Sequence, residues 1–217
     1  MEYFSRFMAT LMLIILSPLF LLISCLSLVF QGNPVLFKQE RIGFAYHPFM
    51  LIKFRSMIKN NSNNKITNAD DNRITLWGKL LRTLKLDELP QLWNIVKGDM
   101  RFIGPRPEVQ EFVSSNDFSF LTKIKPGLTD FSSILFRNES EILSHSGGIE
   151  KYPKLLELKV ELGHLYAKHK NFLLDIKLVL LTLVAIFFPK TAVTLVKENF
   201  IEKHKPDLIP AINYWIK

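Results

Sequence analysis

The chain has 217 residues, of which 48% are hydrophobic and 22% charged. This composition supports one packed domain, or one domain with an appendage, and it excludes disordered, collagen-like and coiled-coil chains. The single cysteine, Cys25, excludes an intrachain disulfide, and the five histidines lack a zinc-binding spacing. No glycine-rich dinucleotide or P-loop string occurs.

The formal charge of +8 is distributed unevenly along the chain. Residues 1–37 contain one acidic and one basic side chain, Glu2 and Arg6, so the whole excess lies in residues 38–217. A basic body behind a neutral, apolar head suits a membrane surface or a partner that carries phosphate. Nucleic acid is a poor candidate partner, because no nucleic-acid-binding motif accompanies the positive charge.

The first predicted element is the uncharged run Phe7–Phe30. As one helix it would measure about 36 Å, enough to cross a hydrocarbon layer of about 30 Å. Pro18 leaves the carbonyl of Ile14 unpaired, and the Ser17 hydroxyl can bond the carbonyl of Leu13 and bend the same turn. The run is either a kinked spanning helix, which the segment alone favours, or two arms that enter and leave by one face. A cleaved signal peptide is disfavoured, because apolar residues continue past any small-residue site.

A β-hairpin is predicted next, with strands over Val35–Glu40 and Phe49–Arg55 and a turn at Gly43 and His47–Pro48. The second strand has the period-two pattern of a half-buried strand, with apolar side chains expected on one face at Met50, Ile52 and Phe54. The asparagine-rich stretch 60–72 predicts a surface loop.

Two amphipathic helices follow, each with apolar residues at positions i, i+3, i+4 and i+7. The first carries Trp77, Leu80, Leu81 and Leu84, and the second carries Leu89, Leu92, Trp93 and Val96. Lys97–Gly98 is expected to end the second helix.

Further along, Ser144 to Gly148 predicts a flexible joint. The apolar run Leu178–Phe188 is too short to span a bilayer and predicts a core or interfacial helix.

The acidic pair Asp87–Glu88 lies between these two helices, just before Pro90. The structural interpretation, which the pair alone favours, makes Asp87 the N-cap of the second helix and Glu88 a first-turn acid. The functional interpretation uses the same position, since a helix N-terminus lowers the pKa of an aspartate and attracts phosphate. Asp87 could then attack phosphorus, and Glu88 is a candidate ligand for a divalent metal. Asp99 is a second candidate for that metal or for hydrogen-bond support.

Several basic side chains are candidates for binding phosphate. Arg106 is fixed between two prolines in Gly104–Pro107, and its planar fork matches two phosphate oxygens. The other candidates are Lys53, Arg55, Arg82 and Lys125. Each of these, taken alone, is more often a solvated surface base.

Five strings occur in a fixed order along the chain: FKQERIG (37–43), KFRSM (53–57), LRTLKLDELPQLWNIVKGDM (81–100), IGPRPE (103–108) and KPGLT (125–129). Together they closely resemble the bacterial sugar transferase family of monotopic polyprenol-phosphate phosphoglycosyl transferases. The resemblance covers nearly the whole chain, and the apolar head with Ser17–Pro18 fits it too.

The resemblance implies an α+β, mostly helical monotopic membrane protein. Residues 1–37 would form a re-entrant helix, broken at Ser17–Pro18, and a linker. Residues 38–217 would form a cytosolic catalytic domain with a short β-hairpin and interfacial helices. The resemblance therefore reverses the preference for a spanning helix. It also implies that the protein lies in the bacterial inner membrane, with the catalytic domain on the cytoplasmic face.

The resemblance also implies an activity. Such enzymes transfer a sugar-1-phosphate from a UDP-sugar to polyprenol (undecaprenyl) phosphate and release UMP, the first membrane step of capsule, O-antigen or related glycan synthesis. Asp87 would be the nucleophile of a ping-pong route through an aspartyl-phosphosugar intermediate. Glu88 would help to bind Mg²⁺ or position the acceptor phosphate. Arg106 would grip the donor phosphate.

One departure from the family pattern concerns residues 130–139. Many larger relatives continue K-P-G-[IL]-T with glycine, whereas this chain has Asp130 and then Phe136–Glu139. This chain resembles the short, single-domain branch. Three other functions stay open. The protein could be a glycosyltransferase that releases UDP, a phosphatase of lipid or nucleotide phosphates, or a membrane scaffold without catalytic activity. The sequence predicts neither the sugar nor the oligomeric state.

Overall fold

The structure, a computed structural model, describes residues 2–58 and 71–216. The loop predicted at 60–72 therefore lies outside the described residues, except for Asp71 and Asn72.

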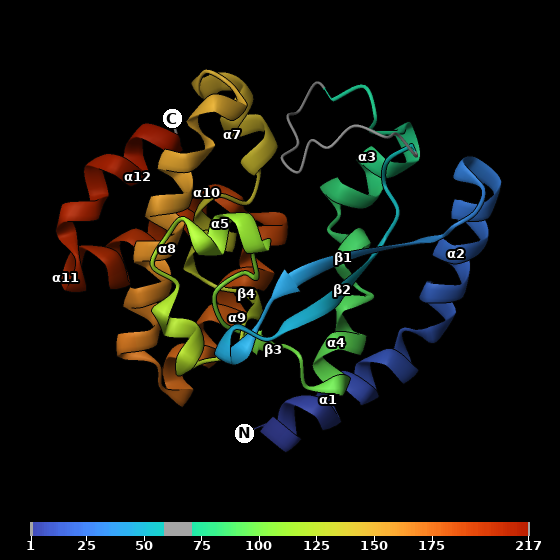
Figure 1. Cartoon of the computed structure of the whole chain (residues 1–217), viewed down its shortest axis with the longest axis horizontal. Coiled ribbons are helices and arrows are strands. Elements are labelled where there is room, and N and C mark those ends of the chain that lie inside the picture. The colour runs from blue at the N-terminus through green and yellow to red at the C-terminus, as the bar shows by residue number, and fades with distance from the viewer. Residues whose placement is uncertain (1, 59–70, 217) are drawn as a thin grey trace.

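The fold is α+β and mostly helical, as the sequence predicts. Its helices are α1 (Glu2–Ile15), α2 (Ser17–Gln31), α3 (Leu76–Thr83), α4 (Gln91–Lys97), α5 (Gln110–Ser114), α6 (Phe131–Leu135), α7 (Glu139–Ser146), α8 (Tyr152–His169), α9 (Phe172–Phe187), α10 (Pro189–Val196), α11 (Glu202–His204) and α12 (Ile209–Trp215). Its strands are β1 (Leu36–Ile42), β2 (Pro48–Phe54), β3 (Arg101–Ile103) and β4 (Gly127–Thr129). In Figure 1 the β1–β2 hairpin extends from α2, past α3 and α4, toward the remaining helices.

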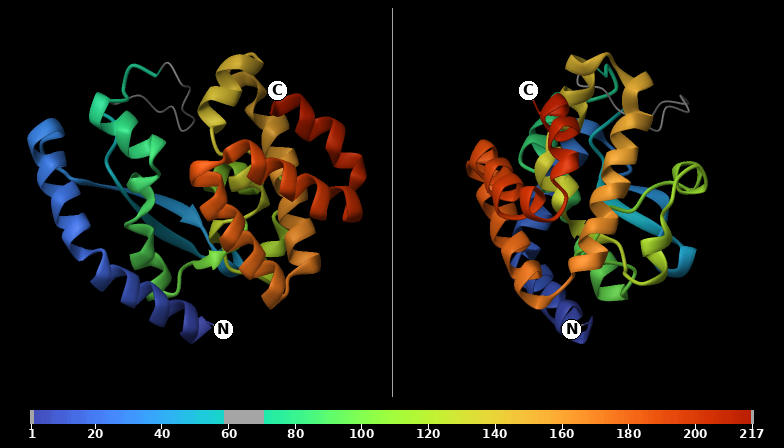
Figure 2. Two further views of the ribbon diagram at one scale, coloured as in Figure 1. Left: turned by 180° about the vertical axis from the view of Figure 1, so that it is seen from behind. Right: turned by 90° about the vertical axis from the view of Figure 1, so that its left-hand side faces the viewer.

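The apolar head forms two helices whose axes differ by 61°. The Ser17 hydroxyl donates to the carbonyl of Ile14 at 2.7 Å, not to Leu13 as expected. This is the carbonyl that Pro18 leaves without an N–H donor, so the hydroxyl satisfies it at the bend. No single helix within the described ranges has the length and hydropathy to cross a bilayer, whereas α1 and α2 together do. Figure 2 shows the pair as one bent arc.

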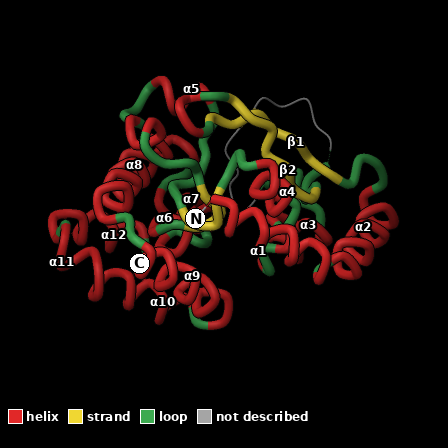
Figure 3. Tube along the Cα trace, turned by 90° about the horizontal axis from the view of Figure 1, so that it is seen from below, coloured by secondary structure: helices red, strands yellow, loops and turns green. Residues whose placement is uncertain are grey.

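Both ends of this arc bind the rest of the molecule. At the start of α1, the Glu2 carboxylate accepts a hydrogen bond from Lys125 Nζ at 2.7 Å. At the end of α2, the Arg55 guanidinium donates to the carbonyls of Gln31 and Gly32, at 2.5 and 2.6 Å. Between the two ends, α1 packs on α4, and α1 and α2 follow one edge of the molecule (Figure 3).

The predicted hairpin is confirmed, and β1 pairs antiparallel with β2. The expected burial in β2 is confirmed at Phe54, which is 2% exposed, and is wrong at Met50, which is 46% exposed while Leu51 is 3% exposed. The cause is Asn94 of α4, whose side-chain amide donates to the Met50 carbonyl and accepts from the Ile52 N–H. These two bonds attach β2 to α4, so Leu51 joins the core there. The domain boundary expected after residue 37 lies inside β1.

The two predicted amphipathic helices correspond to α3 and α4. Gly98 ends α4 in the left-handed conformation, with a φ of 88°, as the sequence predicts. The buried face is narrower than expected, since Leu81 and Leu92 are buried while Leu80 and Trp93 are about half exposed.

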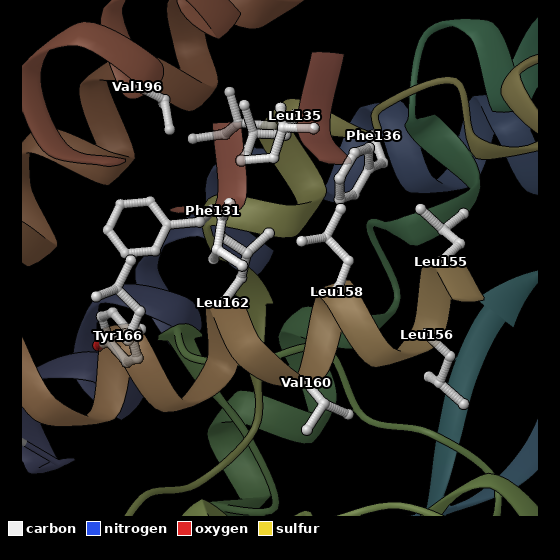
Figure 4. Close-up of a cluster of buried hydrophobic side chains, with 14 of the residues drawn as sticks. Phe131, Leu135, Phe136, Leu155, Leu156, Leu158, Val160, Leu162, Tyr166 and Val196 are labelled. Carbon is white, nitrogen blue, oxygen red and sulfur yellow. The ribbon is translucent and has the colours of Figure 1, made fainter. Parts of the chain in front are cut away.

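The main core is built around α8, whose apolar face packs on α6, and α10 covers the other side of α6 (Figure 4). The predicted apolar helix lies within α9, which buries Leu178 and Ala185 and exposes apolar side chains on its opposite face. The joint expected at residues 144–148 is shorter than predicted. Residues 144–146 belong to α7, and Gly147 and Gly148 alone leave the helix with positive φ.

A parallel pair of short strands, β3 and β4, brings two of the motif strings together. Gly127 approaches Gly104 so closely that a Cβ atom on Gly127 would lie 2.1 Å from the Gly104 nitrogen. The Gly127 N–H donates to the Pro105 carbonyl at 3.0 Å. The Lys-Pro-Gly segment thus supports the loop that carries Arg106.

Candidate active site

Asp87 and Glu88 lie in a single 3-10 turn, Leu86–Glu88, before α4. The N-cap interpretation of Asp87 is wrong, because Pro90 takes the N-cap position and no side chain caps the helix. Asp87 is 7% exposed, and its buried Oδ1 atom has no hydrogen-bond partner among the residues that the structure describes. A buried, unpaired carboxylate oxygen is costly and marks a candidate functional group.

Glu88 is held by two cations. Arg106 Nη2 and Nη1 donate to its two carboxylate oxygens at 2.6 and 3.3 Å, and Lys53 Nζ lies 3.7 Å from Oε1. Burial alone would raise the pKa of Glu88, but the charges of Arg106 and Lys53 outweigh it and hold the pKa well below its usual value. Glu88 is therefore a fixed anion.

The pKa of Asp87 is shifted in the opposite direction from that of Glu88. Burial raises the pKa of Asp87 above its ordinary value, and the adjacent charge of Glu88 adds to the increase. The cations Lys53, Lys85 and Arg82 oppose this effect. The expectation of a lowered pKa fails because Asp87 does not lie at the N-terminus of α4. Two adjacent carboxylates whose pKa values are pushed apart are typical of an active site.

The other sequence-predicted residues divide into two groups. Arg82 stays close to the pair: its Nε atom donates to Ser56 Oγ at 2.9 Å, and its charge acts on Asp87. Arg55 and Lys125 instead hold the two ends of the α1–α2 arc, and the structure does not bring them to the pair. Asp99 follows the far end of α4, where it accepts a hydrogen bond from Asn94 at 3.1 Å. The structure does not bring Asp99 to the pair either.

Two further cations lie near the pair and were missed by the sequence analysis. Lys85 Nζ donates to the Arg137 carbonyl at 3.1 Å, and the charges of both side chains interact with Glu88. Lys85 precedes Asp87 by two residues, so its place in the motif string was the available signal. Arg137 offered no comparable signal, because it is distant from the pair in sequence.

A buried ionic network supports the Arg106 loop from behind. Glu108 accepts from Arg41 Nη1 at 2.9 Å and from Lys159 Nζ at 2.7 Å. Burial alone would raise the pKa of Glu108, but the charges of Lys159 and Arg41 outweigh it and lower the pKa to about 2. Because Glu108 follows Arg106 by two residues, this network helps to fix the direction from which Arg106 reaches Glu88.

The site has more positive than negative charge. Two carboxylates are surrounded by the cations Lys53, Arg82, Lys85, Arg106 and Arg137. An arrangement of this kind suits a substrate that carries several negative charges, such as a diphosphate.

Lys53 is expected to lose its proton near pH 8 rather than near 10.5, because burial and the charge of Arg106 lower the pKa of its ammonium more than Glu88 raises it. Glu88→Gln removes the opposing attraction and is expected to lower the pKa of Lys53 further. A carbon-13 titration of the Lys53 Cε resonance, identified with Lys53→Arg, measures both values. A wild-type midpoint near 10.5, or a higher pKa in Glu88→Gln, would contradict this geometry.

The same shift has a consequence for stability. Between pH 8 and 10.5 the unfolded state binds more protons at Lys53 than the folded state does. The contribution of Lys53 to the free energy of unfolding therefore rises with pH across this window.

Comparison with known proteins assigns the chain to a family. Residues 2–189 match the family model described as bacterial sugar transferase. A UDP-glucose:undecaprenyl-phosphate glucose-1-phosphate transferase of Klebsiella pneumoniae is 34% identical over 195 residues, which cover 85% of this chain and 39% of that protein. A UDP-N-acetylgalactosamine-undecaprenyl-phosphate N-acetylgalactosaminephosphotransferase of Aeromonas hydrophila is 32% identical over 78% of this chain and 39% of its own length.

An uncharacterized sugar transferase of Bacillus subtilis, EpsL, is 35% identical over 153 residues, which cover 70% of this chain and 69% of that protein. The chain therefore spans about two fifths of the length of the first two relatives and a larger share of the third. Since the family match includes most of the chain, the protein belongs to the bacterial sugar transferase family.

Proposed function

We propose that the chain transfers a sugar-1-phosphate from a UDP-sugar to polyprenol phosphate, with undecaprenyl phosphate as the acceptor, and releases UMP. The observation that supports this most directly is the unpaired, buried carboxylate oxygen of Asp87 among cations. The activities for which the Klebsiella and Aeromonas relatives are named belong to this class. The reaction would begin a membrane-bound glycan pathway.

Asp87 is the nucleophile in this proposal. Its carboxylate oxygen attacks the phosphorus that carries the sugar, the bond from this phosphorus to the bridging oxygen breaks, and UMP leaves with the electron pair. A phosphate oxygen of the acceptor then attacks the same phosphorus and releases Asp87. The product is a polyprenol diphosphate sugar, and the carboxylate is regenerated. Two steps at one aspartate avoid bringing two anionic substrates together at once.

The surrounding residues hold Glu88 in place and are available to bind the phosphates of the substrate. Arg106 fixes Glu88 through two hydrogen bonds and keeps further N–H groups that can reach a phosphate oxygen. The positive charges of Lys53 and Arg82 stabilise the ionised form of Asp87. The same charges would stabilise a bound phosphate. Since the cations keep Glu88 ionised, it is suited to holding these cations in place rather than to donating a proton.

Mg²⁺ is part of the proposal. No group of three His, Cys, Asp or Glu side chains that could hold a metal gathers within residues 2–58 and 71–216. Arg106 takes both Glu88 oxygens, so the carboxylate oxygen that fits this ion is the unpaired Oδ1 of Asp87. Mg²⁺ commonly uses one or two carboxylates together with substrate phosphates and water. When bound, Mg²⁺ would neutralise charge on the phosphate oxygens.

We also propose that the α1–α2 arc is re-entrant, and that residues 1–37 embed in the cytoplasmic face of the bacterial inner membrane while residues 38–217 form the catalytic body on that face. The contacts of the arc support this. Glu2 binds Lys125, and Gln31 binds Arg55, so both ends of the arc contact the same basic body. A spanning arrangement would separate these ends by the thickness of the bilayer.

The exposed apolar face of α9 is suited to lying in the same interface. Its outward side chains include Val179, Leu180, Leu183, Ile186 and Phe187. They would set the depth at which the catalytic turn meets the acceptor headgroup.

Asp87→Asn is expected to lower turnover by at least about a thousand-fold, because the amide cannot form the covalent bond. Release of nucleotide from a panel of UDP-sugars, with and without a short polyprenol phosphate, measures this effect. Lys154→Met, an exposed residue of α8, serves as the control and is expected to retain wild-type turnover.

The nucleotide product also separates the alternatives. UMP supports the proposal. UDP would indicate a glycosyltransferase, and turnover that does not need polyprenol phosphate would indicate a phosphatase. An Asp87→Asn variant with full biological activity would indicate a scaffold.

Re-entry is expected to leave both ends of the arc on one side of the membrane. In a Cys25→Ser background, Tyr3→Cys and Lys38→Cys each supply one exposed thiol, and Lys154→Cys marks the side of the body. An impermeant maleimide applied to inside-out vesicles should label all three variants. Labelling of Lys38→Cys and Lys154→Cys without Tyr3→Cys would identify a spanning segment instead.

A further inference from the structure

Lys85 has the left-handed helical conformation, with φ of 56° and ψ of 21°. A residue with a side chain seldom adopts it, because Cβ crowds the following carbonyl. Two other non-glycine residues of the described chain, Ala45 and Tyr46, have positive φ, and both lie in the connection between β1 and β2. Strain of this kind persists where the surroundings fix it, and it gathers at functional sites.

The backbone of Lys85 forms the corner between α3 and the acidic turn. Its N–H donates to the Arg82 carbonyl at 3.1 Å, and its own carbonyl accepts from the Glu88 N–H at 3.3 Å. The conformation at this one residue therefore sets the direction in which Asp87 and Glu88 leave α3.

The side chain of Lys85 extends to a distant part of the chain. Its Nζ atom donates to the carbonyl of Arg137, 52 residues away, at 3.1 Å. Two residues further on, Glu139 accepts from the buried Lys159 of α8 at 3.1 Å. The segment between α6 and α7 is thus held from two sides, by Lys85 at Arg137 and by Lys159 at Glu139.

We propose that Lys85 is a positioning residue: its bond to the Arg137 carbonyl fixes the carboxylate of Asp87 relative to the Arg137 guanidinium, a cation available to the phosphates of the substrate. This inference rests on the proposed function. A displacement of about 1 Å in such a constellation can slow a reaction by about a hundred-fold.

The alternative role is purely structural, in which Lys85 does no more than end α3. Glycine would serve that role better, since it adopts the left-handed conformation without steric cost. Lys85→Gly therefore separates the two roles, because it relieves the backbone and removes the bond to Arg137 in one change.

The test compares Lys85→Gly, Lys85→Met and Lys85→Arg for kcat, for KM of each substrate and for the thermal midpoint. We expect Lys85→Gly to keep or raise the midpoint while kcat falls by about 10- to 100-fold with little change in KM. Lys85→Met should lose a similar factor in kcat, and Lys85→Arg should recover most of it. Ala45→Gly relieves the same kind of strain away from the acidic pair and should leave kcat unchanged.

Wild-type kcat in Lys85→Gly, or a kcat that follows the thermal midpoint across all three variants, would overturn the proposal. Amide hydrogen exchange gives a readout that does not depend on activity. Exchange in residues 136–139 should accelerate in Lys85→Gly and Lys85→Met, with α8 unchanged. Unaltered exchange in that segment would overturn the proposal that the bond from Lys85 to the Arg137 carbonyl holds it. If exchange accelerates in the variants but the wild-type protein forms no UMP, the proposed function would be overturned. The role of the bond between Lys85 and Arg137 in holding the segment would stand.

Discussion

The ion pair between Glu88 and Arg106 is the interaction on which the rest of the site depends. It joins the acidic turn before α4 to the loop between β3 and α5, with a closest distance of 2.6 Å. Because Glu88 takes the arginine, its neighbour Asp87 is left with a buried oxygen that has no hydrogen-bond partner in the described part of the chain. One carboxylate is therefore fixed and ionised, and the other is available for chemistry.

The remainder of the fold maintains this division. The Gly104–Gly127 contact and the Glu108–Lys159 ion pair place the Arg106 loop, while Asn94 attaches β2, and with it Lys53, to α4. Burial of so many charges is stabilising only where each has partners. The buried Oδ1 atom of Asp87 has no hydrogen-bond partner among the described residues, and it is therefore available to form a bond to a substrate phosphorus.

The apolar head is connected to the same machinery. Lys125 bonds both the Glu2 carboxylate and the Gly98 carbonyl, so the start of α1 is tied to the end of α4. The end of α2 is tied to Arg55, which directly follows β2. In the membrane arrangement that we propose, these bonds would hold the acidic turn at a fixed depth relative to the lipid headgroups.

Local patterns were sufficient for much of the fold. Apolar periodicity located α3, α4 and α9, and the glycine at position 98 marked a helix end, because these signals depend on nearby residues alone. The roles of Arg55 and Lys125 could not be read in this way, since their partners lie 24 and 123 residues away. The burial phase of β2 depends on a polar residue of another element, Asn94. A left-handed lysine at position 85 has no sequence signature, because lysine carries no preference for that conformation.

Mass analysis of the protein after incubation with a UDP-sugar and no acceptor tests the central claim most directly. Trypsin should release the peptide Leu86–Lys97, which contains Asp87 and Glu88. We predict that this peptide gains the mass of one sugar phosphate on Asp87, that polyprenol phosphate removes it, and that Asp87→Asn never acquires it. UMP formed only when both substrates are present, with no adduct at position 87, would contradict the account.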